Sequence, residues 1–192
     1  MKKECFNKEL SYIKNERIRK SCCVMLDLLP DYFYEIPASS TGKYHPEFTL
    51  GDKGLVRHVK VAVLIARDLL ENPTIGGKYT NDEKDLMIMA LILHDGLKSG
   101  LTHNRYTQVD HPTLIKNYIL ENKDNLSLTD DELTFVGKVI EAHMGPWNTD
   151  YNGNVVLPAP KTKYENFVHM CDYLASRKYL NVKFDNNNDI VL

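Results

Sequence analysis

One stretch of sequence decides the fold: residues 82 to 98, which read DEKDLMIMALILHDGLK. Its centre, residues 86 to 93, is the longest run in the chain without a polar residue. A helix that is apolar on every side is buried on every side, so we expect a central helix over residues 82 to 94. The run is far shorter than the roughly 20 apolar residues that span a bilayer, so it predicts a core helix and no membrane segment.

Apolar residues at helical spacing predict further helices on both sides of this stretch. We expect helical segments over residues 5–29, 55–70, 112–122, 130–145 and 164–179. Pro112 suits the first position of its helix, and Thr129 with Glu132 forms a capping-box pattern ahead of the next one. Very little of the chain alternates with the period of two that marks strands. The predicted fold class is therefore all-α, a helical bundle.

The domain organisation follows from length and from the positions of the loops. A chain of 192 residues suits one compact domain with a sizeable core. We expect residues 54–180 to form the helical domain, residues 1–53 to supply an N-terminal helix and an ordered loop that pack on it, and residues 181–192 to form a polar tail. Turn-forming residues in segments 36–54 and 145–163 predict long loops, and loops of this length usually carry function.

Charge and cysteine content narrow the class of protein further. The chain has 24 Lys and Arg against 26 Asp and Glu, a formal charge of −2, so no overall field draws it to nucleic acid. The first ten residues are rich in charge and lack the apolar segment of a secretory signal. The four cysteines show no CxxC spacing. We expect a cytoplasmic protein with reduced thiols, and the sequence leaves a homo-oligomer open.

Polar side chains of the metal-ligand type recur on the predicted buried helix faces. His58 continues the apolar stripe of its helix, because Ala62, Ile65 and Ala66 follow at +4, +7 and +8. A lone buried histidine is more often satisfied by a backbone carbonyl. Burying many titratable groups without partners is costly, however, and a metal ion removes that cost. The complete set of inward-facing candidates is His58, His94, Asp95, His111, His143 and Asp172.

The order of these residues resembles the HD-domain metal-dependent phosphohydrolase superfamily over about residues 54–180. The motifs that carry the resemblance are GLVRH at 54–58, LILHDGLK at 91–98, DHP at 110–112, EAHMG at 141–145 and MCDYLASR at 170–177. Within the superfamily the ligand order looks most like that of bacterial dinucleoside tetraphosphate hydrolases. Met144 stands where some two-metal branches place a second consecutive histidine, which puts full occupancy of a second site in question.

The resemblance implies a binuclear metal site. It assigns His58, His94, Asp95 and Asp172 to a first ion, and His111 and His143, with Asp95 as a bridge, to a second. Two divalent ions outweigh two carboxylates, so the site would stabilise a phosphoryl transition state, and a hydroxide that bridges the metals is the expected nucleophile. Mixed imidazole and oxygen ligation favours Mn, Fe, Co or Ni over Mg or Zn.

Four further side chains are candidates for contact with the substrate. Lys98 matches the family lysine that contacts phosphate. The alternative interpretation is that Lys98 is a solvated cation at a helix end. Arg105 is a second candidate phosphate contact or a surface arginine. Lys43, or His45 beside it, would reach the site if residues 36–54 fold over its mouth. Trp147 would stack on a base or pack in the core.

We therefore expect a metal-dependent phosphohydrolase that cleaves a phosphoester or phosphoanhydride of a nucleotide, with Asp95 and Lys98 as its catalytic residues. One alternative is a nuclease of the same superfamily acting on the ends of single-stranded RNA or DNA, which would need a basic groove lined with aromatic side chains. A second is a non-catalytic nucleotide-sensing module that has kept its metals. Binding of a nucleotide without turnover would identify the second alternative.

Overall fold

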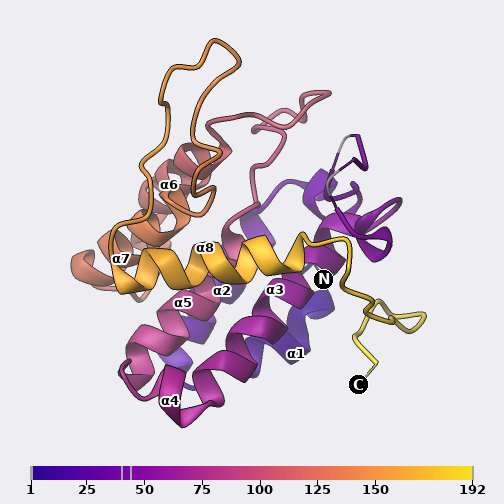
Figure 1. The fold of residues 1–192 in the computed structure, drawn as a ribbon. Coiled ribbons are helices and arrows are strands. Elements are labelled where there is room, and N and C mark those ends of the chain that lie inside the picture. The colour runs from indigo at the N-terminus through magenta and orange to yellow at the C-terminus, as the bar shows by residue number, and fades with distance from the viewer. Residues whose placement is uncertain (1, 40, 44, 192) are drawn as a thin grey trace.

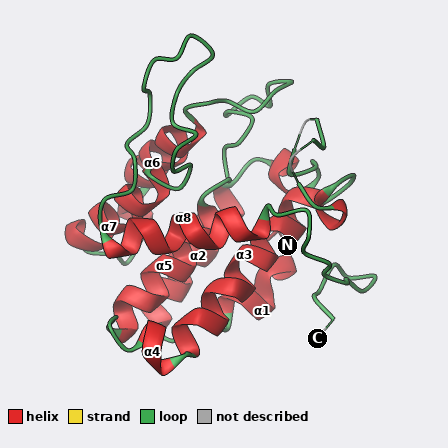
Figure 2. Ribbon diagram, in the orientation of Figure 1, coloured by secondary structure: helices red, strands yellow, loops and turns green. Residues whose placement is uncertain are grey.

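The computed structural model describes residues 2–39, 41–43 and 45–191. Within these residues the regular structure is helical, with two isolated β-bridges, Thr149 to Val155 and Phe184 to Ile190 (Figure 2). The all-α prediction is confirmed. The α-helices are α1 (Asn7–Leu10), α2 (Glu16–Leu28), α3 (Gly54–Glu71), α4 (Pro73–Gly76), α5 (Asn81–Leu93), α6 (His111–Glu121), α7 (Asp130–Glu141) and α8 (Lys163–Ala175).

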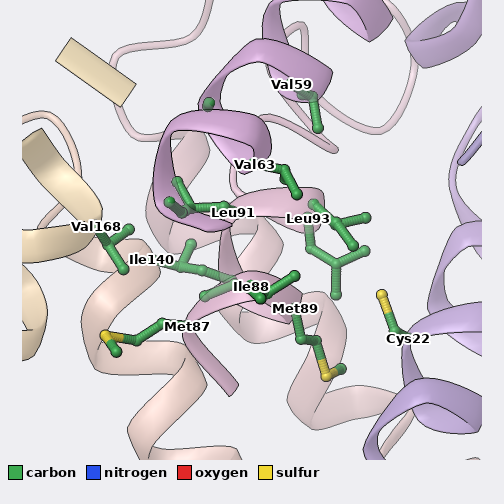
Figure 3. Packing of buried hydrophobic residues seen from close by; sticks show 14 of the residues in the cluster. Cys22, Val59, Val63, Met87, Ile88, Met89, Leu91, Leu93, Ile140 and Val168 are labelled. Carbon is green, nitrogen blue, oxygen red and sulfur yellow. The ribbon is translucent and has the colours of Figure 1, made fainter. Parts of the chain in front are cut away.

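Helix α5 is the centre of the fold, as its sequence predicts. Every residue from Asp85 to Leu93 is buried, and the helix contacts α2, α3, α7 and α8. Figure 3 shows its side chains pointing in several directions, toward Cys22 of α2, Val63 of α3, Ile140 of α7 and Val168 of α8. A capping box between Thr80 and Glu83 begins the helix. The polar residues that follow Leu93 are therefore held at the end of a rigid, fully packed element.

The N-terminal segment differs from the single helical stretch expected over residues 5–29. A 3-10 turn (Lys2–Phe6) and the short α1 precede a break, and α2 begins only at Glu16. The cause is Asn15, whose side chain accepts a hydrogen bond from the Arg17 amide and caps α2. The Asn15 backbone amide is used outside the helix, because it donates to Asp85 Oδ2 at 2.6 Å. The prediction of one continuous segment is wrong for this reason.

Helices α7 and α8 end four residues earlier than expected, at Glu141 and Ala175. In each case side chains form hydrogen bonds with a backbone carbonyl that would accept from an amide of the next helical turn if the helix continued. The backbone amide and Nδ1 of His143 both lie at hydrogen-bond distance from the Ile140 carbonyl. The hydroxyl of Ser176 and Nε of Arg177 both donate to the Tyr173 carbonyl. Local side-chain bonds of this kind compete with helix continuation.

The three long loops lie on one side of the bundle (Figure 1). They follow Glu35, the end of α5 and the end of α7. The first is anchored at both ends, because the Ala38 amide donates to the Thr49 carbonyl and the Lys53 amide donates to the Glu35 carbonyl. At the C-terminus, Asp189 pairs with the fully buried Lys60 at 2.7 Å, so the polar tail is tied to α3.

The first prediction concerns the central helix. Leu91 is fully buried in α5, whereas Leu101 in a loop is 60% exposed. We expect Leu91→Ala to lower the free energy of unfolding by about 2–5 kcal/mol, because it removes buried methyl groups and leaves a cavity. Leu101→Ala should change it by less than about 0.5 kcal/mol. Urea denaturation of both variants measures the difference, and equal effects would contradict the central position of α5.

The second prediction concerns the pair that joins α2 to α7, in which both terminal nitrogens of Arg17 donate to Glu132 at 2.6 Å. The Arg17 hydrogen bond lowers the pKa of Glu132 to about 2 from its ordinary 4.5. Because this pKa is lower in the folded state, the pair stabilises the protein above about pH 4.5, and the contribution disappears as the pH falls toward 2. We expect Glu132→Gln to lose stability near neutral pH and to approach the wild type in acid.

Denaturation curves collected from pH 7 downward test this dependence. The exposed Glu121→Gln provides the matched control, since it makes the same chemical change elsewhere on the surface. A Glu132→Gln deficit that stays constant over the whole pH range would rule out the ionic contribution.

Candidate metal centre

The six predicted ligands lie together in one buried cluster. They come from five helices or their ends: His58 from α3, His94 and Asp95 from the end of α5, His111 from the start of α6, His143 from the turn after α7 and Asp172 from α8. Their ligand atoms form three overlapping triads whose members lie within 4.8 Å of one another: His58, His94 and Asp95; His94, His143 and Asp172; Asp95, His111 and His143.

Asp95 occupies the middle of this cluster, with one oxygen on each side. Its Oδ2 lies 3.5 Å from His94 Nε2 and 3.8 Å from His58 Nε2. Its Oδ1 lies 3.0 Å from His111 Nε2 and 3.8 Å from His143 Nε2. The two carboxylate oxygens therefore face two different pairs of histidines, which is the geometry that a bridging ligand requires.

Backbone carbonyls orient three of the four imidazoles. Nδ1 of His94, His111 and His143 lies 2.7 Å from the carbonyl oxygens of Leu91, Gln108 and Ile140, respectively. A carbonyl oxygen only accepts, so each Nδ1 carries a hydrogen, and a neutral ring then presents the lone pair of Nε2 to the cluster. This is the tautomer and the orientation that a metal-ligating histidine needs.

Among the described residues, the cluster buries lone pairs that no hydrogen-bond donor meets when its rings are neutral. Nε2 of His111 and Nε2 of His143 face each other at 3.3 Å, which sets two lone pairs in opposition if both rings are neutral. Within the described part of the chain, His94 Nε2 and Asp95 Oδ1 are buried without a hydrogen-bond partner. Unpaired buried polar atoms are costly. Cations held on the two sides of Asp95 would satisfy these atoms, so the residues present fit divalent metal ions.

The pKa values in the cluster reflect burial and the charges of the neighbouring groups. Burial by itself would raise the pKa of Asp95, but the charges of Lys98 and the nearby imidazoles hold it well below its usual range. Burial would lower the pKa of His94, and the two carboxylates nevertheless raise it. Burial and the neighbouring His94 lower the pKa of His143 to about 3, so this ring is neutral at physiological pH and available as a ligand.

A cavity of about 520 Å³ opens onto the cluster. Its lining includes Asp95, Lys98 and His111 on the cluster side, and Ser39 and His45 from the loop that follows Glu35. That loop therefore reaches the site, as predicted. His45 is packed against His58 with ring centroids 5.5 Å apart, and burial lowers its pKa to about 3. The volume falls within the range of small-molecule sites in proteins.

The four predicted substrate contacts occupy different places. Lys98 and Trp147 line the main cavity. Arg105 lines an adjacent cavity of about 230 Å³, which shares Lys98 and Thr107 with the main one. Lys43 is exposed and is not among the lining residues of either cavity, so its contact with phosphate stays a prediction.

One wall of the cavity consists of residues that the sequence argument did not single out. They are His169, Tyr173, Ser176 and Arg177, on or just after α8. The available signal is the spacing of four between His169, Tyr173 and Arg177, which places them on one face of the helix expected over residues 164–179. Trp147 stacks on Tyr173, with ring centroids 5.6 Å apart and planes 13° from parallel.

Comparison with known protein families gives one match, to the family described as HD domain, over residues 55–177. The match covers more than half of the chain and includes all six residues of the cluster. The chain belongs to the HD-domain family. Searches of curated proteins and of solved structures gave no match. The HD domain is a metal-dependent phosphohydrolase family, and its members bind divalent metals, which agrees with the chemistry of the buried cluster.

None of the helices in the described residues combines the length and the apolar character that a bilayer crossing requires.

The third prediction concerns metal binding by this HD domain. Mn²⁺ added to protein stripped with a chelator should raise the melting temperature, because ligand binding to the folded state alone stabilises it by about 2.7 kcal/mol at 100 times the Kd. We expect His94→Ala to abolish this shift, whereas His103→Ala, which changes a histidine outside the cluster, should retain it. Thermal melts paired with metal analysis measure both effects. An equal shift in both variants would contradict the cluster as the metal site.

Proposed function

We propose that this HD domain hydrolyses a phosphoester or phosphoanhydride of a nucleotide in a metal-dependent reaction. The observation that carries the proposal is the buried cluster of four imidazoles and two carboxylates at the base of a cavity of about 520 Å³. Such a cluster attracts cations, and the cations attract the phosphate of a substrate. The cavity has room for a nucleotide, and its aromatic side chains suit a base.

The first ion would be held by His58, His94, Asp95 and Asp172, and the second by His111, His143 and the shared Asp95. The two triads that contain Asp95 and the two-sided position of its carboxylate support this division. Mixed imidazole and oxygen donors favour Mn, Fe, Co or Ni. When bound, such ions polarise a phosphoryl oxygen and lower the pKa of water.

Lys98 is the protein's own cation at the base of the cavity. Its ammonium donates to Asp95 Oδ2 at 2.6 Å, and its side chain is only 12% exposed. A compact ammonium held there would contact an oxygen of the reacting phosphate and stabilise the negative charge that accumulates on it. Asp95 thus has two roles, since it orients Lys98 and contributes a carboxylate oxygen to two of the three triads.

The small number of basic side chains around the cavity favours a nucleotide over a nucleic-acid strand. The lysines and arginines among its lining residues are Lys98 and Arg177, with Arg105 in the adjacent small cavity. A strand-binding groove needs a longer basic track with stacking platforms along it. Cleavage of a labelled single strand, or nucleotide binding without turnover, would replace this proposal with the nuclease or the sensing module.

The fourth prediction compares two variants of the site. Asp95→Ala should lose both metal and hydrolysis, whereas Lys98→Ala should retain metal and lose roughly 10- to 100-fold in kcat, because a charge-assisted phosphate contact is removed. The measurement is turnover by Mn²⁺- or Ni²⁺-loaded protein on nucleoside triphosphates, dinucleoside tetraphosphates, cyclic nucleotides and a labelled single strand. Lys123→Ala, in a 3-10 turn beyond the end of α6, is the control. Wild-type activity in both site variants would refute the assignment.

A further inference from the structure

Arg177 is a half-buried cation in the wall of the cavity, and none of the described carboxylates pairs with it. The other lysine or arginine of this lining, Lys98, is already neutralised by Asp95 at 2.6 Å. An arginine that is partly removed from water without an acidic partner retains an unmet affinity for an anion. The cavity wall therefore contains Lys98, which is paired with Asp95, and Arg177 beside α8, which is paired with none of the described carboxylates.

The guanidinium of Arg177 is held in place before any ligand binds. Its Cζ lies 3.9 Å from the centroid of the Tyr173 ring, a cation–π contact. Its Nε donates to the Tyr173 carbonyl at 3.0 Å, and its Nη2 donates to Ser176 Oγ at 2.7 Å. No described residue accepts a hydrogen bond from Nη1. A planar, fixed guanidinium with a free donor suits phosphate recognition, since little side-chain freedom is lost on binding.

The same tyrosine supports an aromatic surface. Trp147 is stacked against Tyr173 and is 52% exposed. Its loop is fixed close to α8 by Gly145, where a Cβ atom would lie 2.2 Å from the His169 ring and φ is +61°. His169 in turn is bonded through Nδ1 to the His143 carbonyl at 2.7 Å. The large apolar face of the indole is thus rigidly placed beside the metal cluster, where it can stack on a planar ring.

We propose that Arg177 binds a phosphate oxygen of a nucleotide whose base stacks on Trp147, with Tyr173 as the residue that positions both. This inference rests on the proposed function and refines it, because it assigns the α8 side of the cavity to recognition of the nucleotide. The ligand class is a nucleotide with both a base and an anionic phosphate, and neither an inorganic phosphate nor a nucleoside uses the whole surface.

Trp147 is the only tryptophan in the chain, so its fluorescence reports directly on this surface. The experiment titrates AMP, adenosine and inorganic phosphate into protein stripped of metal, which removes turnover from the readout. We expect AMP to quench the fluorescence with higher affinity than adenosine. Arg177→Gln should weaken AMP binding about tenfold or more and leave adenosine binding unchanged, because only the charge-assisted phosphate contact is lost.

Two matched variants complete the test. Lys178→Gln makes the same charge change at the next, exposed position and should bind AMP as the wild type does. Arg177→Lys keeps the positive charge but loses the planar guanidinium, so its affinity for AMP should lie between those of the wild type and Arg177→Gln. Circular dichroism confirms that each variant is folded. Unchanged AMP affinity in folded Arg177→Gln, or an equal loss of AMP and adenosine affinity, would overturn the inference.

Failure of this inference and failure of the proposed function give different results. Metal-loaded enzyme that hydrolyses nucleotides with the same KM in the wild type and in Arg177→Gln would overturn the inference and leave the hydrolase standing. AMP binding that depends on Arg177, in a protein that hydrolyses none of the substrates in any metal, would support the inference and refute the hydrolase.

Discussion

The central constraint on this fold is a cluster of six titratable side chains, five of them buried and Asp172 partly buried, whose lone pairs face one another. Two imidazole Nε2 atoms face each other at 3.3 Å, and a histidine nitrogen and an aspartate oxygen are buried without partners among the described residues. Such an arrangement is unfavourable as a purely structural core, because desolvated polar groups must be paired. A bound cation would pair these desolvated groups, so the same arrangement would serve as a binding site.

The helical scaffold explains how this arrangement is held. Helix α5 is packed on all sides, and it delivers His94 and Asp95 to the cluster at its end. The carbonyls that orient His94, His111 and His143 belong to Leu91, Gln108 and Ile140, each three residues earlier in the chain. His94 and His143 are thereby tied to the last turn of α5 and of α7, and His111 is tied to the loop that precedes α6. The orientation of these three rings is thus set locally, and the packing of α3, α7 and α8 on α5 and of α6 on α7 brings the ligands together.

Recognition is built around the cluster from the loops and from α8. Helix α8 contributes Asp172 to the cluster and Tyr173 to the aromatic surface, so adjacent residues serve chemistry and recognition. The turns that end α7 and α8 also contribute side chains to the cavity. His143 and Arg177 take up, through their side chains, carbonyls that a longer helix would use, and both side chains face the cavity as a result.

Sequence alone determined the all-α class, the central helix and the six residues of the cluster, because apolar periodicity and capping patterns act over one or two helical turns and the motifs are contiguous. Tertiary structure alone decided the break at Asn15, since it depends on Asp85 seventy residues away. It also decided the role open to Arg177. In the sequence Arg177 falls within the expected helix over residues 164–179 and is given no role. Only the fold shows that it lies on Tyr173, in the wall of a cavity, with no carboxylate among the described residues to neutralise it. Contacts between distant segments arise from packing in three dimensions, and local sequence patterns do not record them.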